Sequence, residues 1–248
     1  MDITEHELSA ALREVDDQHR SQMAGMPAQI AELHEGEGAR GLRSERSRLL
    51  SGRTGRTGRS GLVLAVGSAV LTFRQLLSPS IAAQAAAGND VGALAAFAQS
   101  VELAAVEAYK AAAGSGKVTT KAVGAAATLF ASHHTEHAAA FGGAAKAAAT
   151  NKPNPKLLAA VAEQLKGAAD EKAIIKIAYD LENAAAATYM FALGATTDKG
   201  ALGLMASILP VEAQHAVVLG SVLGVPTATL IPPFETDTAA VTPTAFPI

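Results

Sequence analysis

Six histidine and glutamate side chains occupy matched positions in two halves of the chain. Two single glutamates lie 80 residues apart, and each is followed seven residues later by a tyrosine. Two further pairs, each ending in a histidine, lie 78 residues apart. Residues three apart project from one face of a helix, so each pair could act together. Imidazole and carboxylate suit iron, manganese or zinc. The candidate metal ligands are therefore Glu102, His134, His137, Glu182, Glu212 and His215.

Several residues near these positions have plainer interpretations. His133 and Glu136 flank the first histidine pair on neighbouring helix faces, and we expect them at the surface or as supports beside the ligands. Tyr109 and Tyr189 are expected in the core, with hydroxyls that reach the polar groups. Pro210 removes one helical hydrogen bond and could kink its helix just before the second pair.

The elements that must carry these residues are helices. Alanine, the strongest helix former, supplies much of the apolar content, and aromatic residues make up only 4% of the chain. Apolar residues precede each single glutamate at helical spacing, which places both carboxylates beside an apolar stripe. Four long helices and one short helix are predicted, at about residues 89–113, 119–150, 155–166, 170–193 and 198–220.

This arrangement resembles the bacterial ferritin-like domain family. One glutamate from each of two helices and Glu-x-x-His from each of the other two is the metal-binding pattern of such bundles. The resemblance covers about Asp90 to Gly220 and implies an all-α, ferritin-like four-helix bundle built from a duplicated helix pair. It also implies a di-iron or di-manganese type of oxidoreductase. His134 departs from the pattern, because the family has glutamate there. A single metal, an asymmetric pair and a site without metal all stay open.

Composition narrows the alternatives. The chain has no cysteine, which excludes disulfides, thiolate metal sites and iron–sulfur clusters. Its net charge of −3 does not indicate a nucleic-acid partner. We expect a homo-oligomer that binds a transition metal, iron or manganese before zinc, and that uses it for redox chemistry or metal handling. The alternative is a structural or stress-protective bundle without catalysis, or an envelope assembly protein that docks through its N-terminal arm.

The flanking segments differ from the predicted bundle at 86–222. Residues 1–60 are predicted to form a polar, Arg-rich, flexible arm, with an amphipathic helix from Met1 to Arg20 and an affinity for anionic surfaces or membranes. Residues 61–85 resemble an export signal, with an apolar run and a small-residue cleavage site before Ala86. This predicts a cell-envelope or secreted protein, or a cytoplasmic one if the segment is not a signal. The proline-containing tail at 223–248 is expected to be a strap or a loose end.

Overall fold

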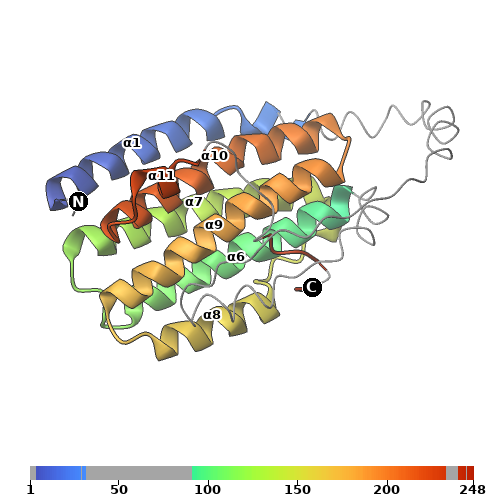
Figure 1. Ribbon diagram of the computed structural model, residues 1–248. Helices are drawn as coiled ribbons and strands as arrows, with labels where there is room; N and C mark the ends of the chain where they lie inside the picture. Colours follow the sequence, from blue (N-terminus) through green and yellow to red (C-terminus); the bar gives the residue numbers. More distant parts are fainter. Residues whose placement is uncertain (1–3, 29, 32–90, 233–239, 244) are drawn as a thin grey trace, which may run out of the picture.

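Four long helices form the body of the protein. The computed structural model describes residues 4–28, 30–31, 91–232, 240–243 and 245–248. Helices α6 (Val91–Gly114) and α7 (Lys121–Ala145) form one hairpin, and α9 (Glu171–Ala195) and α10 (Lys199–Val222) form a second. The hairpins lie side by side, and the described residues contain no strand (Figure 1). The predicted all-α bundle of two helix pairs is confirmed.

Smaller elements close the bundle. The 3-10 turn Lys146–Ala148 follows α7, α8 (Pro155–Gly167) packs against α6 and α9, and the one-turn helix α11 is Thr227–Leu230. Helix α7 ends at Ala145 rather than near residue 150, because Lys146 adopts a positive φ of 53° that no continuous α-helix allows.

Side-chain caps fix where the helices begin. Asp170 and Asp198 accept hydrogen bonds from backbone N–H groups in the first turns of α9 and α10. Thr120 precedes α7, but its side chain does not cap the helix. The carboxylate of Glu171 accepts hydrogen bonds from the backbone N–H groups of Thr119 and Thr120 instead. The first turn of α9 thereby holds the start of α7.

Two apolar clusters lie above and below the positions of the candidate ligands. On α7, for example, Phe130 belongs to one cluster and Phe141 to the other, with His134 and His137 between them. Helices α6 and α10 are each long and apolar enough to cross a membrane. The core helices of soluble bundles meet the same two criteria, so this is weak evidence for a membrane span. Both helices carry a buried glutamate into the bundle.

The predicted N-terminal helix is present, but it is part of the packed structure. Helix α1 (Glu5–Met23) begins with a capping box between Thr4 and Glu7 and lies along α7 and α10 (Figure 1). Its apolar face, which includes Leu8, Leu12 and Val15, is buried in the cluster around Phe130. Residues 5–23 of the expected arm therefore form a helix whose apolar face has a partner in the bundle. Residues 1–3, 29 and 32–60 of the arm and the segment 61–85 lie outside the described residues.

The last described residues of the tail, 240–243 and 245–248, form a strap. Val241 and Phe246 are buried against α8 and α9 residues. The backbone N–H of Val241 donates to Thr188 Oγ1 at 2.7 Å, and the Asn154 amide donates to the carbonyl of Phe246 at 2.9 Å. Of the two alternatives for the tail, the strap fits these last residues.

Candidate metal centre

The six candidate ligands meet in one polar layer inside the bundle. Each of the six residues is at most 2% exposed. The layer takes one glutamate from α6, two histidines from α7, one glutamate from α9, and a glutamate and a histidine from α10. The prediction that these residues face the interior of four packed helices is confirmed. We call this set the polar layer: Glu102, His134, His137, Glu182, Glu212 and His215.

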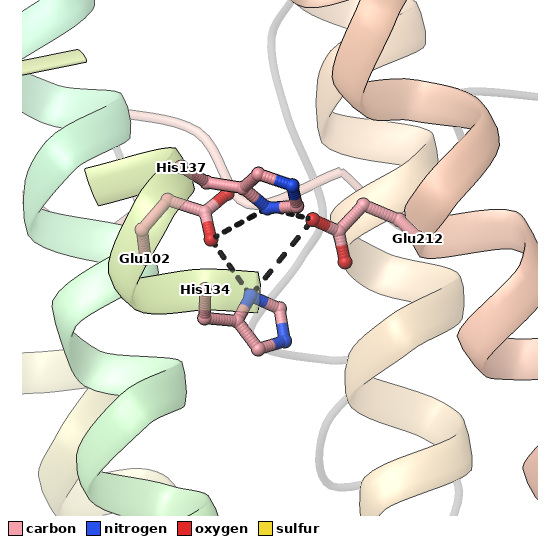
Figure 2. A group of neighbouring side chains, drawn as sticks. All are labelled: Glu102, His134, His137 and Glu212. Atoms are coloured by element: carbon pink, nitrogen blue, oxygen red, sulfur yellow. Dashed lines mark hydrogen bonds and ion pairs between the residues drawn. The ribbon is translucent and has the colours of Figure 1, made fainter. Parts of the chain in front are cut away.

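The polar layer contains two overlapping groups that could each hold a metal ion. In the first, Glu102 and His137 join His134 and Glu212, and Figure 2 shows these four side chains pointing toward one another. In the second, Glu182 and His215 join the same shared pair. Within each group the potential ligand atoms lie within 4.8 Å of one another. The geometry therefore offers two neighbouring positions that share two side chains.

His134 lies at the centre of this arrangement. Its Nδ1 is 2.7 Å from Glu102 Oε2, whereas its Nε2 is 3.2 Å from Glu182 Oε1. The two ring nitrogens thus face carboxylates from different halves of the bundle. Burial alone would lower the pKa of His134, but Glu212, Glu182 and Glu102 outweigh that effect and raise it well above its ordinary value. Without metal, this imidazole serves as the central cation of the layer.

Other polar atoms of the layer lack hydrogen bonds. His137 Nδ1 lies 2.9 Å from Glu212 Oε1, yet the two groups are not aligned for a hydrogen bond. Both ring nitrogens of His137 and both carboxylate oxygens of Glu212 have no hydrogen-bond partner among the described residues. Buried polar atoms without partners are costly. A metal ion bound between these residues would give the Glu212 oxygens, and a His137 nitrogen that has lost its proton, a bonding partner.

Two tyrosines connect the halves reciprocally. The Tyr109 hydroxyl on α6 donates to Glu182 on α9, and the Tyr189 hydroxyl on α9 donates to Glu102 on α6. Burial and the neighbouring carboxylates raise the pKa of both hydroxyls well above the ordinary value, so both stay protonated donors. The expectation that these hydroxyls reach the polar groups is confirmed, and each one fixes a candidate ligand of the other half.

Opposite charges balance within the layer. Burial opposes ionisation of Glu102, but contacts with His134 and His137 outweigh it and lower the pKa to about 2. Burial also opposes protonation of His137, but Glu102 and Glu212 raise its pKa to about 9. The pKa of Glu182 is likewise lowered despite burial, chiefly by His134 and His215. Because metals bind neutral imidazole, metal binding here must release protons.

Two further histidines, His19 on α1 and His133 on α7, lie beside the polar layer, and the repeat did not reveal them. His133 and His19 are each 1% exposed, and their rings stack with centroids 3.8 Å apart. Of the two expectations for His133, the surface position is wrong, because α1 covers it, and the position beside the ligands is right: its Nδ1 lies 2.9 Å from His215 Nε2. Glu136 is half-exposed and contacts His19 Nε2 at 3.3 Å.

A signal for His19 was present in the sequence. It continues the apolar stripe of Leu8, Leu12 and Val15 at helical spacing, which places it on the buried face of α1. Burial lowers the pKa of both His19 and His133 to about 3, with a further contribution from neighbouring histidines. These two rings are therefore neutral at physiological pH, unlike His134.

Comparison with known proteins agrees with this geometry. The model of the ferritin-like domain family matches residues 89–225, more than half of the chain. The match spans all four long helices and every residue of the polar layer. Neither the comparison with curated proteins nor that with solved structures gave a match.

Proposed function

The chain belongs to the ferritin-like domain family, and on that premise we propose that its polar layer binds a divalent transition metal for redox chemistry or metal handling. Iron or manganese is the preferred ion and zinc the alternative, because the donors are imidazole and carboxylate. The observation that carries the proposal is that both ring nitrogens of His137 and both carboxylate oxygens of Glu212 make no hydrogen bond, although both residues are 0% exposed. A buried carboxylate with no hydrogen bond to either oxygen favours a cation at that place.

Each part of the layer has a role in this proposal. Glu102 with His137, and Glu182 with His215, would each serve one metal position, while His134 and Glu212 lie between the positions. A bound iron or manganese ion would supply one-electron redox chemistry. The protein would orient the carboxylates through Tyr109 and Tyr189 and exclude bulk water by burial.

Charge limits how many ions the layer holds. It contains three carboxylates, whereas the family pattern with two Glu-x-x-His motifs provides four. One divalent ion would leave one negative charge in excess, and two would leave one positive charge in excess if the imidazoles are neutral. Neither one nor two divalent ions balances the charge of the layer. We therefore expect one fully occupied metal position and one that binds its ion more weakly.

The decisive experiment is elemental analysis of full-length protein made with abundant iron, manganese and zinc. We expect at least one equivalent of a transition metal per chain. The double variant His137→Ala with His215→Ala should lose it, because each metal position loses the imidazole that it does not share with the other. The exposed His6 offers a matched control, and His6→Ala should keep the metal. Well under one equivalent in the unaltered protein would contradict the proposal.

A second candidate function is a structural or stress-protective bundle without catalysis. The hydrogen-bonded contacts of His134 with Glu102 and Glu182 favour it, since they neutralise these buried charges without any metal. The melting temperature discriminates between the candidates. Metal binding to the folded state alone must raise the melting temperature as the metal concentration rises, whereas a purely structural bundle melts at the same temperature with or without metal.

A further inference from the structure

A line of side chains connects the surface of α1 to the polar layer. Asp16 Oδ1 on α1 lies 3.4 Å from His133 Nε2 on α7. The other nitrogen of that ring, Nδ1, lies 2.9 Å from His215 Nε2 on α10. His215 Nδ1 in turn lies 3.2 Å from Glu182 Oε2 and 3.6 Å from Glu212 Oε2. Helices α1, α7, α10 and α9 therefore each contribute to one continuous path.

We propose that Asp16 and His133 are positioning residues for His215, so that α1 is a working part of the metal centre. This inference rests on the proposed metal-binding function. It assigns a role to a helix that lies outside the part of the chain that the family model matches. The proposed role is to hold the imidazole of His215 in the orientation and tautomer of a ligand.

Proton placement along the path has one consistent solution. Only Nδ1 of His215 faces the polar layer carboxylates, so Nδ1 must carry the free lone pair for a metal. The ring proton then lies on Nε2 and is donated to His133 Nδ1. His133 consequently carries its own proton on Nε2, which points to Asp16. Groups that hydrogen-bond a ligand histidine in this way fix its tautomer and its basicity.

Ring packing holds the same geometry. His19 stacks on His133, and Phe130 stacks on His215 with centroids 4.0 Å apart. The buried face of α1 covers His133, which is only 1% exposed. Removal of water from this contact strengthens its hydrogen bonds. Neither ring can rotate freely while α1 is in place.

The other half of the bundle lacks this support. The position equivalent to His133 in the repeat is Val211, which has no polar side chain to offer His137. Both ring nitrogens of His137 indeed lack a hydrogen-bond partner within the described residues. The support is therefore specific to the position that contains His215. Loss of Asp16 should weaken that position and leave the other unchanged.

The experiment is a calorimetric titration of the full-length, metal-free protein with zinc(II) alone. Asp16→Asn should weaken zinc binding about 10- to 100-fold at one position, the range found when such supports are removed. Asp17→Asn is the matched control, because Asp17 is the next residue on α1 and is exposed. It makes the same change of charge and should bind zinc as the unaltered protein does.

A pair of further variants separates positioning from packing. Gln at position 133 can still accept the hydrogen bond from His215, whereas Leu cannot, so His133→Gln should bind zinc more tightly than His133→Leu. In the background of His215→Ala, Asp16→Asn should have no further effect on the remaining position, as a double-mutant cycle requires when two residues act through each other.

The outcomes are distinct. If the unaltered protein binds no zinc and none of the other metals, the proposed function fails and the inference fails with it. If it binds metal but Asp16→Asn and His133→Leu bind zinc as tightly as Asp17→Asn does, only the inference is overturned. Equal losses in His133→Gln and His133→Leu would also overturn it, because packing would then be the sole role of His133.

Discussion

The two halves of the bundle share a backbone plan but differ in chemistry. Each half places a buried glutamate on its first helix, and each glutamate accepts a hydrogen bond from a tyrosine of the other half. Two of the differences between the second helices bear on the site. His134 corresponds to Glu212, and His133 corresponds to Val211. The apolar pattern and the tyrosines are therefore present in both helix pairs. The polar side chains around the site, in contrast, differ between the two pairs.

This difference shows what decides the charge of a buried histidine. His133 and His134 are adjacent in sequence and almost equally buried. Burial lowers the pKa of both rings, yet the carboxylates around His134 reverse the effect. His133 instead faces three other histidines and only one carboxylate, that of Asp16. Neighbouring charges, rather than burial, separate a cationic imidazole from a neutral one.

The largest effect is expected from restoring the carboxylate in the first half. His134→Glu should raise the number of metal ions bound, because it supplies a fourth carboxylate between the two positions. In the metal-free protein it removes the central cation and adds a like charge beside Glu102, Glu182 and Glu212. One carboxyl must then keep a proton, so its pKa is raised above the unfolded value.

The sign of the pH effect follows from that raised pKa. The stability of metal-free His134→Glu is retained below the unfolded pKa of a glutamate and lost as pH rises through the folded one. We expect a lower melting temperature at about pH 8 than at about pH 5, and recovery on addition of metal. Elemental analysis and thermal melts at both pH values test this. An unchanged metal content together with an unchanged melting temperature would contradict the assignment of His134 to the polar layer.

A smaller effect is expected when pH is varied in the unaltered, metal-free protein. The pKa of His137 is raised to about 9, so its stabilising contribution is present below the unfolded value of 6.5 and lost as pH rises toward 9. The pKa values of His19 and His133 are lowered to about 3, so their contribution is present above 6.5 and lost as pH falls. The melting temperature should therefore be highest near neutral pH.

Two variants separate the acid side of this pH profile from the alkaline side. His19→Phe keeps a ring that can stack on His133 and removes a group that must stay neutral, so it should reduce the fall in melting temperature between about pH 6.5 and 5. His137→Gln should reduce the fall between about pH 7 and 9 without altering the acid side. A profile whose two sides do not respond separately would contradict the division into cationic and neutral histidines.

The repeat made the bundle and the polar layer predictable. Offsets of 80 and 78 residues identified all six buried positions, because equivalent places on duplicated helices face the same interior. The packing of α1 was not predictable in the same way. An amphipathic stripe indicates that a helix has a buried face but not which surface covers it. The sequence therefore left a surface position open for His133, because the helix that buries this residue begins 128 residues earlier in the chain.

Export is a proposal that now bears on the site. Cleavage before Ala86 would remove α1, and with it Asp16 and His19. The inference that α1 supports His215 requires the working protein to retain this helix. N-terminal sequencing of native material distinguishes the two: a start near Ala86 supports export of a processed chain, and retention of residues 5–23 supports the role of α1 in the metal centre.

The smallest difference between the halves is expected at the tyrosines. Tyr109→Phe and Tyr189→Phe each remove one hydrogen bond to a buried, ionised glutamate. Hydrogen bonds to charged groups contribute about 1.5–3 kcal/mol, so each variant should lower the free energy of unfolding by an amount in that range. The two losses should be similar, because the bonds are reciprocal and both hydroxyls are fully buried. They need not add in the double variant, since both glutamates also contact His134 and belong to one network. Urea unfolding of the metal-free protein measures all three values. A large loss for one tyrosine and none for the other would mean that the pseudo-symmetry of the helices does not extend to the hydrogen bonds that hold the glutamates.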